Sequence, residues 1–413
     1  MADTFHTTDG LLEALEAESF PRPPALVANA HVTGLSVARA LKRANIPVIA
    51  IDRSPDGVAP PSNAVDYAGG VTYPLDDAEG FKGDVESIVG AVGRDVVAFA
   101  CMDEWVHAFA ETAPEGVRRP VSGPETIDRV LDKESLYSSA EALGVPYPET
   151  YRLSETDPER AIDELGFPLV IKPARKREFE EAIGTNVVEV HDRAEFDEIV
   201  AAAREAGIRI MAQERVDVEQ GRDHSVGSYV PPSGGTENAL AFVGNPAVRY
   251  PLSFGTSTLV ERSPLPSVEA NALTILDDCS YHGISEAEFV YDRSRERYVL
   301  LDINTRPWKW IGLPVESGVN LPLAAYASVT EATYERGPDR RTRWVYLRDY
   351  LALLAGEGQF RDRFDSETWR SILSGGFENQ PGLTTGVYRP SDPGPAAKLI
   401  ETEFSEREYY CAC

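Results

Sequence analysis

The sequence predicts a protein of mixed α/β and α+β class: an N-terminal doubly wound parallel α/β domain, then a unit built in two parts, then a small C-terminal region. Three observations lead to this prediction. In residues 25–125 short apolar runs alternate with helical periodicity, as in parallel sheets. From residue 126 charged helices alternate with strands that pair as hairpins. The 413 residues are enough for two or three domains.

The composition indicates a globular protein with a strongly acidic surface. The 67 acids exceed the 40 bases and give a net charge of −27, which argues against nucleic acid or an anionic membrane as a partner. No apolar run reaches the length of a membrane span, and the first 24 residues lack the pattern of a secretory signal. The four cysteines have no metal-ligand spacing. We therefore expect a cytoplasmic protein.

The basic residues are unevenly divided, because only seven of the 40 are lysine. An acidic surface with few lysines resembles proteins of a salt-loaded, halophilic cytoplasm, where screening weakens the repulsion between like charges. An ordinary acidic protein is the alternative. Where lysine is scarce, each retained lysine is a stronger functional candidate.

We place unit boundaries where the sequence pattern changes. The acidic, polar start of the chain is interpreted as an extension, and the last part has no role that its sequence indicates. The predicted units are 1–24 (extension), 25–125 (α/β domain), 126–334 (two-part unit, divided into 126–216 and 217–334) and 335–413 (C-terminal region).

The α/β domain begins with a β–α–β unit. Ala25–Ala28 and Pro47–Asp52 are apolar, and Leu35–Arg43 between them has helical periodicity. The loop before this helix has Gly34 alone where a dinucleotide fingerprint has three glycines, so NAD binding is not supported.

Acidic residues follow a later strand of the same domain. Val96–Ala100 is apolar, and Asp103 and Glu104 come shortly after it. Ligands in open α/β sheets bind beyond the carboxyl ends of the strands. The two acids are therefore candidates for holding a substrate amine, with His31 lining the same crevice. Their alternative role is to cap the next helix, and Asp52 likewise has a cap or a ribose contact as its two interpretations.

Two lysines stand out in the first part of the following unit. Lys133 lies in a charged helix, and Lys172 ends the buried-type strand Phe167–Pro173, where a lysine needs an anionic partner. The charged segment Ala174–Thr185 is predicted to be a mobile loop. Ile208–Val216 is a further strand.

A predicted hairpin carries the densest set of chemical groups. Its strands are Ala287–Tyr291 and a second run from Leu300, joined by a polar turn. Glu288 and Asp302 interrupt these apolar strands. Side chains alternate along a strand, so Asp302, Asn304 and Arg306 point the same way. Carboxylate and amide oxygens suit Mg²⁺, and a guanidinium suits a phosphate or carboxylate. A surface hairpin is the alternative.

The C-terminal part of the chain is predicted in outline only. Leu321–Ala332 and Trp344–Gly356 have helical patterns, with the polar segment Glu335–Arg341 between them.

The order of these motifs along residues 25–330 resembles the ATP-grasp superfamily, preceded by its usual N-terminal α/β domain. The motifs that carry the resemblance are Lys133, Lys172-Pro173, Gln213-Glu214-x-Val216, Glu288 and Asp302-x-Asn304-x-Arg306. Two details depart from the family pattern: Asp302 stands where glutamate is common, and the loop after Lys172 is basic instead of glycine-rich.

The resemblance implies a role for each matching residue. The nucleotide residues would be Lys133 and Lys172 on the phosphates, Gln213, Glu214 and Val216 at the adenine, and Asp223, with His224 as a weaker candidate, on the ribose. Glu288, Asp302 and Asn304 would bind Mg²⁺, with Mn²⁺ as the alternative metal, while Arg306 would stabilise an acyl phosphate and Lys309 would add positive charge beside it.

The implied activity is an ATP-dependent carboxylate–amine ligation that forms an amide or peptide bond through an acyl phosphate. Its partners would be a small carboxylate and an amine, in a possible homodimer. Arg249 and Arg262 are candidates for binding substrate carboxylates, with surface salt bridges as the alternative. Three other functions stay open: a carboxylase-type enzyme that activates bicarbonate, a kinase on the same fold, and a non-catalytic nucleotide-binding protein.

Overall fold

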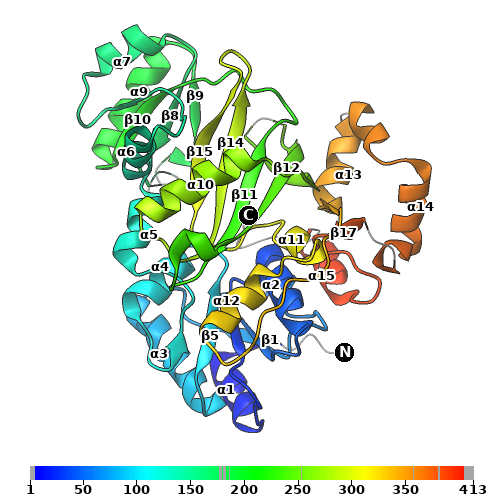
Figure 1. The fold of residues 1–413 in the computed structure, drawn as a ribbon. Helices are drawn as coiled ribbons and strands as arrows, with labels where there is room; N and C mark the ends of the chain where they lie inside the picture. Colours follow the sequence, from blue (N-terminus) through cyan, green and yellow to red (C-terminus); the bar gives the residue numbers. More distant parts are fainter. Residues whose placement is uncertain are drawn as a thin grey trace.

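The computed structural model describes residues 5–175, 179, 183–185, 187–252, 254–356, 358–379 and 382–403. The chain forms an N-terminal α/β domain, a small antiparallel sheet, a large central sheet and a C-terminal helical region beside it (Figure 1). The fold class predicted from the sequence is confirmed. In the described ranges no helix is both long and apolar enough to cross a membrane.

The N-terminal domain is a six-stranded sheet whose neighbouring strands are all parallel, in the order β1-β4-β3-β2-β5-β6. Because β3 and β5 lie on opposite sides of β2, the winding reverses between β2 and β5, and a crevice is expected beyond their carboxyl ends. The elements are β1 (Phe5–His6), α1 (Thr8–Glu16), β2 (Ala25–Ala28), α2 (Val32–Lys42), β3 (Val48–Asp52), β4 (Tyr67–Gly70), α3 (Ala78–Val92), β5 (Val96–Ala100), α4 (Asp103–Thr112) and β6 (Val117–Arg118).

The structure corrects the interpretation of residues 1–24 as an extension. Strand β1 pairs with β4 at the edge of the sheet, and Leu11 and Leu15 of α1 are buried against the core of the domain. Helix α1 starts at a cap in which the Thr7 side chain accepts from the backbone N–H of Gly10. A two-residue strand has no periodicity, so its pairing is invisible in the sequence.

The small sheet has the order β7-β10-β8-β9 and is antiparallel throughout. One face packs on α7 and α9 through Leu169, Ile171 and Ala212. Lys172 and Gln213 alternate with these residues, so they lie on the opposite face. The elements are α5 (Pro124–Leu131), α6 (Lys133–Leu143), β7 (Thr150–Arg152), α7 (Pro158–Leu165), β8 (Leu169–Pro173), β9 (Val188–Val190), α9 (Arg193–Glu205) and β10 (Ile210–Glu214). Much of the predicted mobile loop Ala174–Thr185 lies outside the described residues.

The central sheet has seven strands in the order β15-β14-β11-β12-β13-β16-β17, antiparallel except for the last pair. Helices α6 and α10 cover one face through an apolar core. The predicted hairpin is confirmed as β14 and β15. The elements are β11 (His224–Val230), η1 (Gly235–Asn238), β12 (Leu240–Tyr250), β13 (Thr256–Arg262), α10 (Pro266–Asp278), β14 (Gly283–Asp292), β15 (Arg297–Asn304), α11 (Gly312–Glu316) and α12 (Leu321–Ser328).

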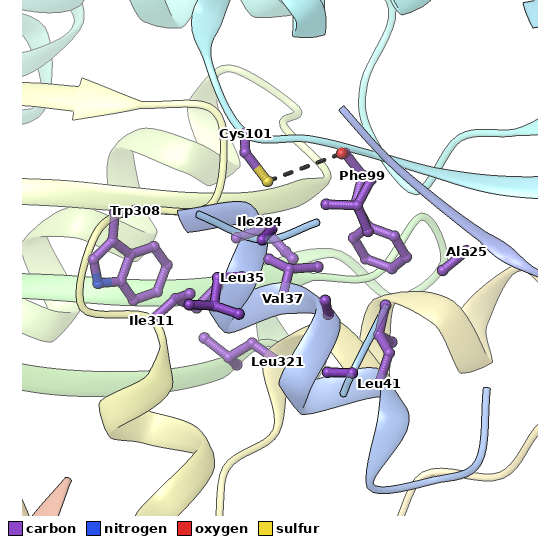
Figure 2. Packing of buried hydrophobic residues seen from close by; sticks show 14 of the residues in the cluster. Ala25, Leu35, Val37, Leu41, Phe99, Cys101, Ile284, Trp308, Ile311 and Leu321 are labelled. Carbon is purple, nitrogen blue, oxygen red and sulfur yellow. Dashed lines mark hydrogen bonds between the residues drawn. The ribbon is translucent and has the colours of Figure 1, made fainter. Parts of the chain in front are cut away.

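The other face of the central sheet meets the N-terminal domain through two tryptophans. A Cβ atom on Gly227 would lie 2.2 Å from Trp308, and one on Gly244 would lie 2.9 Å from Trp310. The indoles can therefore lie directly on the strands because these two positions have no side chain. Figure 2 shows Trp308 beside residues of α2 such as Leu35, in the core that joins the two domains.

The C-terminal region is built into this core. Its strands extend the central sheet beyond β13, and the Arg39 guanidinium of α2 donates to the Asp392 carboxylate at 2.8 Å. Two predicted helices are shorter than expected: α12 ends at Ser328, and Trp344 lies in strand β16, because its indole is buried in the domain junction. The elements are β16 (Arg343–Val345), α13 (Leu347–Gly356), η2 (Gly358–Arg363), α14 (Ser366–Ser374), η3 (Gly376–Asn379), β17 (Leu383–Thr385) and α15 (Gly394–Glu403).

Candidate active site

The centre of the candidate site is the hairpin of β14 and β15. Glu288 pairs directly with Asp302, and Glu286 pairs with Asn304. Paired residues share a face of the sheet, as do residues two apart, so the three carboxyls and the amide lie together. The Asn304 Nδ2 atom is 3.5 Å from Oε1 of Glu288. The hairpin thus brings together all three residues predicted to bind metal: Glu288, Asp302 and Asn304.

A bulge at Leu301 sets this arrangement. The register shifts after Glu288, so that Phe289 pairs with Leu300 and Leu301 has no partner in the ladder. Leu300 and Ile303 are three residues apart and would face opposite ways in a regular strand, yet both are buried in the same core. The extra residue therefore lets the strand bury both side chains while Asp302 stays on the site face.

Lys133 reaches the hairpin from the first turn of α6. Its Nζ atom lies 2.5 Å from Oδ1 of Asp302, and the lysine is only 4% exposed. Its backbone N–H donates to the carbonyl of Ala174, directly after β8. The contact joins a predicted phosphate lysine to a predicted metal acid. Lys172 lies on the face of the small sheet that α7 and α9 do not cover.

The predicted adenine segment ends β10. The Gln213 amide donates to the Thr150 hydroxyl at 2.8 Å, and Glu214 accepts from the Glu149 backbone N–H at 2.7 Å. Glu214 also pairs with Arg295 of the β14–β15 turn. These side chains connect β10 to its neighbours. The carbonyl of Val216, beyond the strand, accepts from Val218 at 3.0 Å.

Arg249 connects two acids to which we assigned different roles. Its Nε donates to Asp223 at 2.9 Å, and a terminal nitrogen lies 3.3 Å from Oε2 of Glu288. Burial raises the pKa of Asp223, which the Arg249 charge opposes. Arg249 thus forms the salt bridges that were the alternative to binding substrate, although inside the site and not on the surface. His224, the weaker ribose candidate, is bonded to Ser263 and the Arg222 carbonyl.

An ion pair connects the start of α4, which follows β5, to Arg306 beyond the hairpin. Asp103, the first residue of α4, accepts from Nε of Arg306 at 2.7 Å. Neither interpretation of Asp103 from the sequence included this ion pair. Glu104 accepts from the Tyr73 hydroxyl at 3.2 Å. The Asp52 carboxylate accepts backbone N–H groups of Ala30 and Arg53 at 2.7 Å each, which supports its structural interpretation.

The last two predicted residues lie at opposite ends of β13. Lys309 donates to the hydroxyl of Thr256 at the start of this strand. Arg262 ends the strand, where it pairs with Asp339 and stacks over Phe242. The structure therefore brings Lys309 to the end of the β12–β13 loop that Arg249 also contacts, and leaves Arg262 at the far end.

Glu286 is a residue of the site that our sequence interpretation missed. It is 6% exposed, and burial, with the Glu288 charge second, raises its pKa to about 8. Its spacing of two from Glu288 was the signal that could have revealed it. Among the residues with described positions, no three or more His, Cys, Asp or Glu side chains form a ready-made metal cluster. A metal at the hairpin would need ligands from its substrate.

The fold was compared with solved structures. Biotin carboxylase from Campylobacter jejuni matches 80% of this chain and 76% of its own, with a TM-score of 0.61 and 14% identity. N5-carboxyaminoimidazole synthetase from Staphylococcus aureus, complexed with ADP, matches 83% and 87%, with a TM-score of 0.60 and 13% identity. The chain shares its fold with these two enzymes. An L-amino acid ligase from Bacillus licheniformis shares the same fold over 75% of both chains, with a TM-score of 0.56 and 15% identity.

Sequence comparison reaches less far. The C-terminal section of the carbamoyl phosphate synthase large chain from Methanopyrus kandleri is 23% identical in an alignment of 232 residues, and the match covers 53% of this chain. The match spans 40% of the length of that relative. No family model matches the chain. These comparisons show a shared fold and leave the reaction to be argued from the site.

Proposed function

We propose that the protein is an ATP-dependent carboxylate–amine ligase, which forms an amide or peptide bond through an acyl phosphate and releases ADP and phosphate. The observation that carries the proposal is the hairpin. Glu288 faces Asp302, Asn304 lies beside them, and the Lys133 ammonium reaches Asp302 at 2.5 Å. Such a set of oxygen ligands and a compact cation suits phosphoryl transfer.

In this proposal ATP binds between the small sheet and the hairpin. Lys133 and Lys172 hold the phosphates, the segment from Gln213 to Val216 holds the adenine, and Asp223 the ribose. One oxygen of Asp223 is buried and makes no hydrogen bond within the described part of the chain, so it is available to a hydroxyl donor. Two fold neighbours are known as an ADP complex and a β,γ-ATP complex, which supports a nucleotide here.

The donor set fits Mg²⁺, and Mn²⁺ as an alternative. Glu288, Asp302 and Asn304 would supply carboxylate and amide oxygens, and Mg²⁺ in proteins commonly takes one or two carboxylates together with substrate phosphates. The positive charges of Lys133 and Arg249 lie beside these carboxylates, at Asp302 and Glu288 respectively. When bound, the metal would neutralise charge on the phosphate oxygens.

The reaction then has two displacements. An oxygen of the substrate carboxylate attacks the γ-phosphorus, and the bond to ADP breaks. The amine nitrogen next attacks the acyl carbon, phosphate leaves, and the nitrogen loses a proton. Arg306 holds the transferred phosphoryl oxygens, because its guanidinium offers several donors in a fixed plane. Asp103 fixes the direction of that guanidinium.

The fold neighbours give one competing reaction specific support. Biotin carboxylase and N5-carboxyaminoimidazole synthetase share the fold, so bicarbonate is the second candidate for the activated acid. The hairpin and Arg306 would serve either acid equally well. A non-catalytic nucleotide-binding protein would leave the buried acids of the hairpin without a use.

A substrate panel tests the proposal. ADP release is measured with Mg-ATP in high salt, with each amino acid alone, with pairs of amino acids, and with bicarbonate. Release that requires both a carboxylate and an amine is expected. Release with bicarbonate alone would favour the carboxylase activity, and nucleotide binding without turnover under every condition would overturn the proposed catalysis.

A further inference from the structure

Lys309 lies in a closed set of partners. It is 8% exposed, and its Nζ atom donates to Oδ2 of Asp349 at 2.7 Å and to the Thr256 hydroxyl at 3.0 Å. The ammonium also lies 4.2 Å from the centre of the Tyr346 ring. A buried ammonium is costly unless such partners compensate for lost water.

The strongest of these partners comes from the C-terminal region. Asp349 lies in the first turn of α13, and Tyr346 directly precedes that helix. Asp349 is itself 4% exposed and accepts from Arg348 at 2.8 Å, while Arg348 also pairs with Glu403 of α15 at 2.7 Å. The region to which the sequence assigned no role therefore holds a lysine from the segment that follows Arg306.

Lys309 is connected to the metal acids through a short loop. Arg249, which contacts Glu288, also donates to the carbonyl of Gly255 at 3.3 Å, and Thr256 follows at once. A Cβ atom on Gly255 would lie 1.9 Å from the Pro251 carbonyl oxygen, so the loop packs tightly on itself here. Lys309 and Arg249 thus fix adjacent residues of one loop.

Position 309 holds a lysine in a chain whose basic residues are mostly arginine. Only seven of the 40 basic residues in this chain are lysine. A structural salt bridge could use arginine, whereas a lysine retained beside the site supplies a compact charge whose protonation can change. Burial lowers the pKa of Lys309, the Asp349 charge raises it, and the Arg348 charge lowers it.

We propose that Asp349 is a positioning residue, through which the C-terminal region fixes the Lys309 ammonium at the acceptor end of the active site. By acceptor end we mean the part of the site around Arg306 and Lys309. The inference rests on the proposed ligase function, in which Lys309 stabilises negative charge near the acyl phosphate. Asp349 touches no reacting atom and acts only through the lysine.

The test compares Asp349→Asn with the wild type. The asparagine keeps the shape and loses the charge, so the pKa of Lys309 falls further. Because the ammonium form is the active one, activity is lost as pH rises through that pKa. The alkaline limb of the kcat profile should move to lower pH, with kcat at neutral pH reduced about tenfold and KM for ATP little changed.

Two further variants test the direction in which the alkaline limb of the kcat profile moves. Asp349→Glu restores the charge and should recover most of the profile. Arg348→Gln removes the cation that lowers the pKa of Lys309. The alkaline limb of the kcat profile of this variant should therefore move to higher pH. This variant serves even if Asp349→Asn does not fold, because Arg348 is only partly buried.

Asp392→Asn is the matched control. Asp392 is also a buried C-terminal aspartate in an ion pair, with Arg39, and makes no described contact with Lys309. It should lower the melting temperature without moving the pH limb. If Asp392→Asn and Asp349→Asn change the profile alike, Asp349 has only a structural role and the inference is wrong.

A readout independent of activity separates this inference from the proposed function. Amine acylation of Lys309, followed by mass spectrometry across pH, reports its pKa in the full-length protein. An unchanged labelling profile in Asp349→Asn would overturn the inference alone. A wild type that releases no ADP in any condition of the panel would overturn the proposed function, and with it the catalytic purpose of the pair.

Discussion

The proposed nucleotide end and the proposed acceptor end of the site each contain a buried lysine bound to an aspartate. Lys133 meets Asp302 at 2.5 Å, and Lys309 meets Asp349 at 2.7 Å. The pairs differ in their setting. Lys133 and Asp302 both belong to the motifs by which ATP-grasp resemblance was found, whereas Asp349 belongs to the C-terminal region outside them.

The two ends of the site therefore differ in which parts of the chain hold their charged side chains in place. The nucleotide end is built by α6 and the central hairpin, and its pair lies among the proposed metal ligands. The acceptor end takes partners from two regions outside the central sheet, since Arg306 depends on the N-terminal domain and Lys309 on the C-terminal region. We infer that the nucleotide end is positioned within the two-part unit itself, whereas Arg306 and Lys309 are positioned by the domains on either side of that unit.

The largest expected effect is at the nucleotide end. Asp302→Ala should reduce ADP release by about 10³-fold or more, because it removes a carboxylate that we propose binds the metal. Nucleotide affinity, measured by calorimetry, should stay within a few-fold, since the adenine segment is separate. Glu288→Ala should behave in the same way.

The control for these variants is Asp217→Ala, which removes an exposed acid paired with Arg293 near the same hairpin. It should leave ADP release close to that of the wild type. Unchanged ADP production in Asp302→Ala would show that the hairpin is not the metal site.

At the acceptor end, Arg306→Lys should lower kcat by about 10²-fold, because a lysine cannot reproduce the planar donors of arginine. Asp103→Asn should have a smaller effect, on the order of tenfold, since it only loosens the guanidinium. Steady-state kinetics with the substrate pair found in the panel measures both. An Asp103→Asn loss larger than that of Arg306→Lys would mean that Asp103 contacts substrate directly.

Asp392 joins the C-terminal region to the N-terminal domain, and its contribution to stability can be measured. Asp392 has its pKa lowered below 3.8 by hydrogen bonds from Ser62, Asn63 and Arg39, which outweigh burial. A lowered carboxyl pKa stabilises the fold above pH 3.8, and this stability is lost as pH falls through the folded-state pKa. Asp392→Asn should therefore lower the free energy of unfolding by about 3 kcal/mol at pH 7.

The measurement is urea denaturation at several pH values. The difference between Asp392→Asn and the wild type should shrink below pH 3.8. A difference that stays constant into the acid range would mean that the charge of Asp392 does not matter.

The smallest expected effect concerns the surface. With a net charge of −27, lowering KCl from molar to tenths of molar should reduce the melting temperature by a few degrees, because repulsion is less screened. The buried pairs at both ends of the site are screened much less, so KM for ATP should respond weakly. Equal melting temperatures across this range would count against halophilic adaptation.

Much of the fold and of the nucleotide end was predictable from the sequence. Apolar runs and helical periodicity are local signals, and they predicted the α/β domain and the hairpin. Glu286 was not predicted, although it is two residues from Glu288 and strand alternation places both side chains on one face. Strands β1, β16 and β17, of two or three residues each, are too short to carry a pattern, and they form through pairing with distant strands.

What the sequence by itself determined is the type and order of the chemical groups: two lysines, an acid and an amide at alternate positions of one strand with an arginine two residues beyond it, and an acid on the neighbouring strand. The tertiary structure alone decided which charge meets which. Arg306 and Asp103 are 203 residues apart, and Lys309 and Asp349 are 40 apart. Periodicity extends over a few turns or one strand, whereas a buried charge takes its partner from whichever segment the core brings within reach.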